Sequence, residues 1–349
     1  MIDVCTIGSI TLDFFIEPFD IGLQNDYFHF PVGDKIRIKK IHKFIGGGAA
    51  NTATGFSKLN LKTAIFGVVG NDHDNDFIIR TLQKNNINTK FLICEKDESS
   101  STSFILLTPN GGRTVFHHRN TNTHFGPKIL DTIPPCRAIY IGHLYDESQK
   151  LFSKLKKYKQ KNKNIIAWNP GKTQFQTGFE YFKNIFALID ILILNVEESE
   201  LFTKIKAIKL KNEAVQRTLN LFDKKDEENA LGKKISLTSE HSAKYHYDVR
   251  KIAQKFLDNG VKKIFITDGG NGAQFFDKNH HFLCPAPNKK PKSTLGAGDA
   301  FSVGVLASEL YNQEVSKQIL WGTYNANSVT QKFGAQEGLL TFEEIGAIV

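Results

Sequence analysis

Short apolar runs alternate with amphipathic segments along most of this chain, and this alternation restricts its possible folds more than any other feature. Candidate buried strands are Val4–Gly8, Thr63–Val69, Ala138–Ile141, Ile165–Trp168, Ile191–Leu194 and Lys263–Thr267. Helical patterns between them include Asp74–Lys84, Glu147–Tyr158 and Tyr245–Asn259. Alternating strands and helices predict an α/β fold in which a central, mostly parallel sheet carries helices on both faces.

Ligands of such sheets collect at the carboxyl ends of the strands. Asn195 and Thr267 each stand at the end of an apolar run, so their spacing alone predicts that both lie at that edge. The sequence contains no internal repeat and no sign of a second independent domain. We therefore expect one α/β unit with its ligand site along one edge of the sheet.

Two stretches interrupt the alternation. Residues Asp13–Ile45 contain two strand-like runs, and Thr102–His118 contains two more around the turn Pro109-Asn110-Gly111-Gly112. The second stretch predicts a β-hairpin, because Pro, Asn and Gly readily adopt the backbone angles of a tight turn. From the residues alone, these strands form either a small separate sheet or an antiparallel edge of the main sheet.

The composition predicts a reduced, cytosolic enzyme. The chain has 349 residues, of which 40% are hydrophobic and 23% are charged, so it can build a substantial core. Its four cysteines lie far apart, and without a Cys-x-x-Cys pair they indicate neither a zinc site nor a disulfide framework. The N-terminal sequence lacks the features of a signal peptide, and no apolar run reaches membrane-spanning length.

The net charge is +9, which suits anionic small molecules such as nucleotides as well as nucleic acids. Much of the lysine lies in two runs, Lys154–Lys163 and Lys204–Lys211, which are typical of solvated helix faces and loops. Because no nucleic-acid-binding motif accompanies these runs, we expect no nucleic-acid partner.

The stretch Ser293–Phe301 combines a bend of small residues, an acid at Asp299 and the start of a helical pattern. Such a bend lets successive main-chain N–H groups point at one spot, and the helix N-terminus behind it adds positive potential. A carboxylate fixed there can take a proton from an attacking hydroxyl while the bend holds an anion. Taken alone, the stretch is equally well explained as a turn with Asp299 as a helix cap.

Four further blocks share this glycine-rich or acidic character. Ile45–Gly55 is a glycine-rich turn that runs into a helical pattern, and Gly8–Asp13 follows the first strand. Ile191–Glu198 contains an Asn-x-x-Glu sequence, and Ile264–Ala273 contains a third glycine-rich loop. In their order along the chain, the blocks resemble the motifs of the ribokinase-like (PfkB) family of carbohydrate kinases.

The resemblance spans nearly the whole chain. It implies one kinase domain over residues 1–349, folded as a three-layer sandwich with a small β-lid from about 13–45 and 102–118. It also implies Mg-ATP as the phosphate donor and a small molecule as the acceptor. The lid is in addition a candidate surface for forming a homodimer.

The resemblance assigns the chemistry to the Ser293–Phe301 stretch. Asp299 matches the base that accepts the proton of the acceptor hydroxyl. The main-chain anion hole for the transferred phosphoryl group matches Gly296, Ala297, Gly298 and Asp299. Small residues at these positions let the backbone approach a phosphate closely.

Asn195 and Glu198 match the family's magnesium motif. Mg²⁺ prefers oxygen ligands and keeps several waters, so a sparse Asn/Glu pair that acts partly through water suits it. Taken alone, Glu198 is better explained as a surface acid in the first turn of a helix.

The third glycine-rich loop matches the site for the ATP phosphates, which implies contacts from Thr267, Gly269, Gly270, Asn271 and Gly272, together with Asn195 and Gly298. The adenine is expected between Pro285–Pro291 and the helical pattern Trp321–Thr330. The alternative is a plain turn between two strands, because this loop has ideal turn chemistry.

The acceptor site implied by the resemblance consists of Thr11, Asp13, Gly47, Gly48, Asn51 and Asp299. An Asp with an Asn offers the donors and acceptors that a polyol needs. From the residues alone, Asp13 is also explained as a solvent-facing turn residue, and Asn51 as a cap of a helix over Ala49–Leu59. Either His118 or Arg119 is a candidate to reach an anionic group of the acceptor.

The chain departs from the family pattern in three places. Ser293 stands where an acid usually helps to hold a monovalent cation, which counts against potassium activation. The Glu of ribose-type members has no clean match after Ile141, although Asp146 and Glu147 are near. The lysine-rich segment 204–244 is longer than usual, and we interpret it as an insertion with a helix around Glu213–Phe222, either a surface excursion or a partner contact.

We therefore predict an ATP-dependent phosphotransferase that acts on a primary hydroxyl of a sugar or sugar derivative. A nucleoside acceptor is the first alternative and would need an aromatic wall, for which Phe14, Phe15 and Phe116 are available. The second alternative is a non-catalytic nucleotide-binding regulator on the same scaffold.

Overall fold

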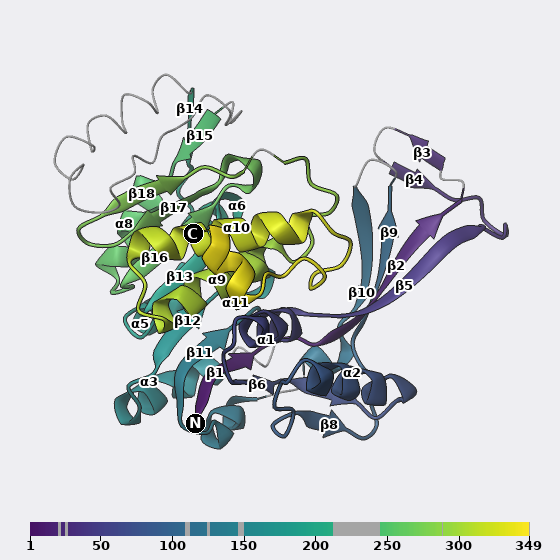
Figure 1. The fold of residues 1–349 in the computed structure, drawn as a ribbon, viewed down its shortest axis with the longest axis horizontal. Helices are drawn as coiled ribbons and strands as arrows, with labels where there is room; N and C mark the ends of the chain where they lie inside the picture. The colour runs from purple at the N-terminus through teal and green to yellow at the C-terminus, as the bar shows by residue number, and fades with distance from the viewer. Residues whose placement is uncertain are drawn as a thin grey trace.

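The computed structural model describes residues 1–19, 22–24, 27–108, 112–123, 126–145, 150–211, 245–287 and 289–348. Its centre is an eight-stranded sheet with the strand order β18-β17-β16-β13-β12-β11-β1-β6 (Figure 1). These strands are β1 (Ile2–Ile7), β6 (Thr63–Phe66), β11 (Cys136–Ile141), β12 (Ile165–Trp168), β13 (Ile191–Asn195), β16 (Lys263–Thr267), β17 (Ala273–Phe276) and β18 (His281–Cys284). Only the pairings of β17 with β16 and β18 are antiparallel. The predicted α/β fold with a mostly parallel sheet is confirmed.

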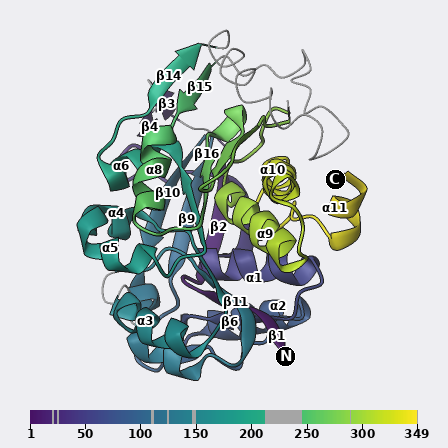
Figure 2. The ribbon, with the colours of Figure 1, turned by 90° about the vertical axis from the view of Figure 1, so that its left-hand side faces the viewer.

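Helices cover both faces of this sheet (Figure 2). Side chains alternate between the two faces of a strand, so neighbouring residues enter different cores. Trp168 packs on one face against helices α3 (Leu151–Lys161), α5 (Phe179–Phe186), α6 (Val196–Thr203) and α8 (Arg250–Asp258). Tyr140 packs on the other face against helices α1 (Gly48–Lys58), α9 (Ala297–Leu310) and α10 (Val315–Thr330). The remaining helices are α2 (His73–Lys84), α4 (Lys172–Thr177) and α11 (Phe342–Ile348).

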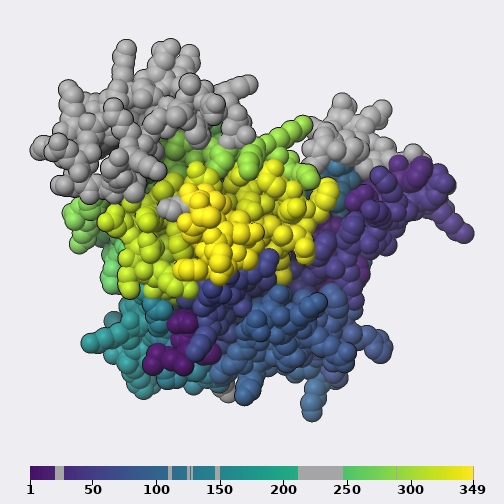
Figure 3. All heavy atoms as spheres, in the orientation of Figure 1, coloured from purple at the N-terminus to yellow at the C-terminus, as the bar shows by residue number. Residues whose placement is uncertain are grey.

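A separate four-stranded sheet forms the lid, with the order β10-β9-β2-β5. Its strands are β2 (Thr11–Pro18), β5 (Ile38–Gly46), β9 (Thr102–Leu107) and β10 (Arg113–His118). In Figure 3 the lid, in purple and blue, projects from the side of the molecule. The alternative in which these strands extend the main sheet is wrong, because β2 turns away from β1 after Ser9 and pairs with β5 and β9 instead.

The two faces of the lid differ in character. Asp13 shares one row with Phe44, Ser103 and His117 across the four strands. Phe15, from the next row on that face, is buried with Ile105, Leu107 and Leu295, so this face meets the body of the molecule. The opposite face carries Phe14 stacked on Phe104, and Phe104 and Phe116 are about half exposed.

Among the described residues, three pairs of short strands lie outside both sheets. They are β3 (Gly22–Gln24) with β4 (Tyr27–His29), β7 (Val68–Gly70) with β8 (Ile93–Glu95), and β14 (Ile208–Lys211) with β15 (Tyr245–Asp248). The 3₁₀ turns are η1 (Asn120–Thr123), η2 (Pro127–Thr132) and η4 (Gly269–Asn271).

Apart from shifts at element ends, such as the start of α10 at Val315 instead of Trp321, two predicted elements differ from the structure. The predicted helix Tyr245–Asn259 is wrong over its first turn: β15 occupies that part, and α8 begins at Arg250. The predicted strand Thr63–Val69 breaks at Gly67, where a Cβ atom would lie 2.8 Å from Ile10 Cδ1, so the chain bends against the start of β2. The predicted helix Glu213–Phe222, the rest of 212–244 and the turn residues 109–111 lie outside the described residues.

Within the described parts of the chain, the helices are all too short or too polar to cross a membrane.

Close packing of α9 on α10 depends on a glycine, which gives a testable prediction. A Cβ atom at Gly304 would lie 2.4 Å from the carbonyl oxygen of Trp321, so Gly304→Ala must push the two helices apart. Overpacking of this kind costs about 1–3 kcal/mol, and we expect a lower urea midpoint of unfolding. The matched control is Gly346→Ala in α11, where a Cβ atom meets open space. An equal midpoint for the two variants would contradict the close contact.

Candidate active site

Asp299 lies in the first turn of α9, directly behind the predicted bend. Gly296 precedes the helix with φ at 77°, a conformation that favours glycine. A Cβ atom there would also lie 2.7 Å from the Cα atom of Ala335, so the close approach excludes any side chain. The sequence therefore forms a tight turn at the N-terminus of α9, directly before Asp299 and beside a pocket that Ala297 and Gly298 line.

A hydrogen bond joins Asp299 to the second glycine-rich motif. Asn51 Nδ2 donates to Asp299 Oδ2 at 2.8 Å, although the two residues are 248 positions apart in the sequence. Burial raises the pKa of Asp299 to about 6; the bond from Asn51 opposes this rise, and the negative charge of Asp13 adds to it. A carboxylate that titrates close to neutral pH is well matched to a general base.

The acceptor residues predicted from the sequence converge on this pair. Thr11 Oγ1 donates to Asp13 Oδ1 at 2.9 Å, and Asp13 is only 7% exposed. Burial raises the pKa of Asp13, while hydrogen bonds from Ser103 and Thr11 lower it. The interpretation of Asp13 as a solvent-facing turn residue is therefore wrong.

Two glycines let the α1 N-terminus approach these acids. A Cβ atom at Gly46 would lie 1.9 Å from Asp13 Oδ2, and one at Gly48 would lie 3.6 Å from Asp299 Oδ1. Gly47 has φ at 89° and is the N-cap of α1, so the interpretation of Asn51 as the cap is wrong. Asn51 lies one turn further along and is free to bond Asp299.

Gln336 completes this cluster and was missed from the sequence. Its Nε2 donates to Asn51 Oδ1 at 3.0 Å and to the carbonyl oxygen of Ile45 at 2.9 Å. The bond to Asn51 occupies its amide oxygen and so directs its NH₂ group toward Asp299. No spacing pattern links Gln336 to Asn51, which is 285 residues away. A sequence signal exists only in the small residues Gly334 and Ala335 before it.

Asn195 and Glu198 form a capping box at the start of α6. Asn195 Oδ1 accepts from the main-chain N–H of Glu198 at 2.8 Å, and Glu198 Oε2 accepts from that of Asn195 at 2.9 Å. Burial raises the pKa of Glu198 to about 7; the bonds from Asn195 oppose this rise, and the charges of Glu197 and Asp299 add to it. Glu198 is thus half-buried and bonded, which contradicts its interpretation as a surface acid.

These residues fit a weakly held Mg²⁺. The negative charge of Asp299 contributes to the raised pKa of Glu198, and a cation held between these carboxylates and the nucleotide phosphates would offset this repulsion. Both members of the box already use one oxygen, which suits contact partly through water. Among the described residues, no cluster of three or more His, Cys, Asp or Glu side chains could bind a metal by itself.

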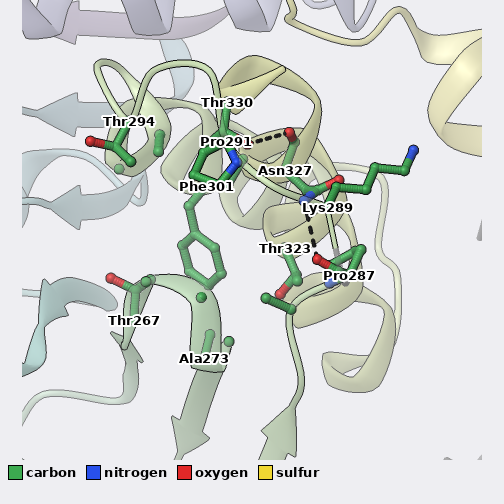
Figure 4. A pocket seen from close by; sticks show the side chains of 17 residues that line it. Thr267, Ala273, Pro287, Lys289, Pro291, Thr294, Phe301, Thr323, Asn327 and Thr330 are labelled. Carbon is green, nitrogen blue, oxygen red and sulfur yellow. Dashed lines mark hydrogen bonds between the residues drawn. The ribbon is translucent and has the colours of Figure 1, made fainter. Parts of the chain in front are cut away.

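The predicted nucleotide residues line one pocket, shown in Figure 4. From the third glycine-rich loop it includes Thr267, Gly269, Gly270 and Gly272, and from the bend it includes Thr294, Ala297 and Gly298. Two predicted nucleotide residues, Asn195 and Asn271, are not among the lining residues, and the side chain of Asn271 donates to Asp268 Oδ2 at 3.0 Å. The loop does connect the antiparallel strands β16 and β17, so the turn and the pocket wall are the same segment.

The two segments predicted to flank adenine form the opposite wall of this pocket. They contribute Ala286, Pro287, Lys289, Pro291, Thr323, Ala326, Asn327 and Thr330. Thr267 and Thr294 lie on one side in Figure 4, and Pro287, Lys289 and Asn327 lie on the other. Thr323 is 5% exposed, and within the described residues its hydroxyl has no hydrogen-bond partner. That hydroxyl therefore suits a polar edge of a bound base.

The remaining predicted positions lie at the rim of the site. Ser293 Oγ accepts from the main-chain N–H of Leu295 at 3.2 Å, so a neutral hydroxyl stabilises the bend at this position. The guanidinium of Arg119 lies 4.8 Å above the ring of Tyr145, which in turn lies 4.1 Å from the ring of His143. Burial lowers the pKa of His143 to about 4, and the charge of Arg119 contributes. Asp146 and Glu147 lie outside the described residues.

Comparison with known proteins identifies the family of the chain. The model of the pfkB family of carbohydrate kinases matches residues 1–341. The chain is 24% identical to a ribokinase of Staphylococcus aureus, with 90% of this chain and 92% of the relative covered. It is 23% identical to a nucleoside kinase of Methanocaldococcus jannaschii, with 89% and 87% covered.

The fold matches solved structures over the whole chain. A putative ribokinase II from E. coli, in complex with ATP and Mg²⁺, superposes with a TM-score of 0.73 at 16% identity and covers 99% of this chain and 98% of that chain. Since the family model covers nearly every described element, the chain belongs to the pfkB family of carbohydrate kinases, which are ATP-binding phosphotransferases.

Proposed function

We propose that this chain transfers the γ-phosphate of Mg-ATP to a primary hydroxyl of a sugar or sugar derivative, with Asp299 as the base. The observation that carries this proposal is the bond from Asn51 to Asp299. It joins Asn51 of the predicted acceptor site to the bend that lines the nucleotide pocket. Acceptor and donor would therefore meet at one carboxylate.

In this reaction the acceptor oxygen forms a bond to the γ-phosphorus, and the bond from that phosphorus to the bridging oxygen of ADP breaks. Asp299 Oδ2 is engaged by Asn51, which leaves Oδ1 to take the hydroxyl proton. The main-chain N–H groups of Gly296, Ala297, Gly298 and Asp299 would hold the charge of the phosphoryl group. Asp13 and Asn51 would orient the acceptor.

Asn195 and Glu198 would hold Mg²⁺ through water, beside the loop that begins at Thr267. Asn195 and Thr267 are direct neighbours in the pairing of β13 with β16, which brings the metal and phosphate residues together. When bound, the ion would neutralise charge on the phosphates during transfer.

A sugar is favoured over a nucleoside by the orientation of the lid. Phe14 and Phe116 lie on the outer face of the lid, away from Asp13, and Phe15 is buried against Leu295. None of these three rings forms the aromatic wall that a nucleobase would need. The row of Asp13, Ser103 and His117 would instead face the acceptor, and Phe44, the fourth member of this row, packs edge-on against Phe15.

The same orientation supports a homodimer through the lid. Phe104 and Phe116 expose 46% and 56% of their surface on the outer face of the lid, and a second copy of this face would cover them. Light scattering should report a dimer for the native chain and a smaller mass for Phe116→Glu.

The four free thiols suit a reducing compartment, as expected for a cytoplasmic enzyme.

A panel assay tests the reaction. The protein is incubated with Mg-ATP and with sugars, sugar acids or nucleosides, and ADP release is followed. Turnover with a sugar supports the proposal, and turnover with nucleosides alone would show that the acceptor is a nucleoside instead. No turnover with any acceptor would favour a non-catalytic nucleotide-binding protein.

Asp299→Asn should lower kcat by at least about a hundredfold, the usual scale for a lost general base. Binding of ADP should change little, because the carboxylate is not needed to hold the nucleotide. The raised pKa of Asp299 means that its ionisation costs folding stability as the pH rises through about 6. The variant should therefore melt at a higher temperature than the native chain at pH 8 and lose this advantage at pH 4. Near-normal turnover would remove Asp299 from the mechanism.

Gln336→Leu should move the acidic limb of the kcat/KM profile to higher pH by about half to one unit. Without the donor from Gln336, the Asn51 amide can rotate, and a weaker bond to Asp299 raises the pKa of that base. The matched control is Gln254→Leu, whose exposed side chain donates to Asp258 on α8. An unshifted limb in Gln336→Leu would contradict the positioning role of this residue.

A further inference from the structure

An arginine of the lid reaches the phosphate side of the nucleotide pocket. Arg113 is the first residue of β10, the edge strand of the lid. In Figure 1 this strand lies on the side of the lid that faces the C-terminal helices. Arg113 Nη1 donates to Thr294 Oγ1 at 2.8 Å across 181 residues of sequence.

Thr294 belongs to the bend before Asp299. It lines the nucleotide pocket together with Ala297 and Gly298, on the side where Figure 4 also shows Thr267. That side is the one assigned above to the phosphates, and the wall around Pro287 lies opposite. Only the Thr294 hydroxyl therefore separates the guanidinium of Arg113 from the side of the pocket where a γ-phosphate would bind.

Apolar packing fixes this arrangement. Leu107 pairs with Arg113 across the hairpin, and it is buried in one cluster with Phe15, Ile105 and Leu295. Leu295 follows Thr294 directly in the bend. The lid is thus seated on the bend by apolar contacts, and the same contacts bring Arg113 to Thr294.

The charge of Arg113 is not neutralised by the protein parts that the structure describes. There, Arg80, Arg137 and Arg250 each form an ion pair with an aspartate, whereas no carboxylate lies within ion-pair distance of Arg113. Burial lowers the pKa of Arg113, as expected for a half-buried cation whose bonding partner is a neutral hydroxyl. The planar guanidinium keeps further N–H donors for a second partner.

We propose that Arg113 is a further catalytic residue, which binds the transferred phosphoryl group from the lid while the amides of residues 296–299 hold it from below. The inference rests on the proposed function. Negative charge spreads over the equatorial oxygens of that group during transfer, and a planar guanidinium can bind two of them. Arg113 exchanges the Thr294 hydroxyl for these oxygens and neither gains nor loses a proton.

This role links the position of the lid to the chemistry. With the lid seated, the phosphoryl group meets both the amides and the guanidinium. If the lid moves away from the bend, Arg113 moves with β10. Transfer of the phosphoryl group to water then lacks the stabilisation that the guanidinium would provide. The acceptor, which Asp13 on the same sheet would bind, thereby favours the state in which transfer is fast.

Arg113→Met tests the role in the full-length enzyme, with the best acceptor from the panel. We expect kcat to fall at least about a hundredfold, below the range reported for arginines supplied to GTPases. The KM for the acceptor should change less than about threefold, and ADP affinity should stay near that of the native chain, because ADP lacks the transferred group. The matched control is Arg37→Met, which removes a lid guanidinium that lies 4.4 Å above the ring of Phe19. This control should retain native kcat.

Two further measurements distinguish a catalytic role of Arg113 from a merely structural one. Thr294→Val removes the hydroxyl partner and keeps the side-chain volume, so it should lose far less kcat than Arg113→Met. Guanidinium added to Arg113→Ala at millimolar concentration should restore activity several-fold and leave Arg37→Ala unchanged.

Equal losses in Thr294→Val and Arg113→Met, without rescue by guanidinium, would overturn the inference. So would native kcat in Arg113→Met when the native chain is active. A native chain that turns over no acceptor would instead overturn the proposed function, and this role with it. ADP titration shows in each case that the variant has folded its nucleotide site.

Discussion

The contact of α1 with α9 is the constraint on which the rest of the site depends. A Cβ atom at Gly55 would lie 2.8 Å from Val303 Cγ2, so the glycine lets the two helices touch. Asn51 and Asp299 lie one turn earlier on the same two helices, and they meet in a hydrogen bond. Both helices point their N-termini at this place, which concentrates positive potential around one carboxylate. The acceptor and nucleotide sides of the molecule are joined through this pair.

The electrostatics of the site follow from burial. Asp13, Asp299 and Glu198 all have a raised pKa, chiefly because burial removes them from water; the charge of Asp13 adds to the rise for Asp299, and the charge of Asp299 adds to the rise for Glu198. Main-chain amides and Arg113 lie on the other side, where the phosphates are expected. The site thus has acids on one side and N–H donors on the other. A substrate with a hydroxyl at one end and a nucleotide with phosphates at the other fit this division.

Much of the fold followed from local sequence, because buried strands need apolar runs and the carboxyl ends of parallel strands share one edge. Asn195 and Thr267 were placed at that edge on spacing alone, and they are neighbours there. The start of α8 was not predicted, since an alternating strand such as β15 also satisfies a short helical pattern. Gln336 and Arg113 were missed for another reason: the partners of both side chains lie far away in sequence. The outward orientation of Phe14 and Phe116 depends on strand register, which the sequence left open.

The capping box at Asn195 and Glu198 ties two properties of the molecule together. The side chains that would bind a metal also cap the start of α6. A substitution at either position therefore weakens this helix end together with the ion site. Over evolutionary time, the pair can therefore change only jointly or at the expense of local order. A lineage that abandoned catalysis would still have a structural reason to keep both residues, and their presence by itself is a poor record of activity.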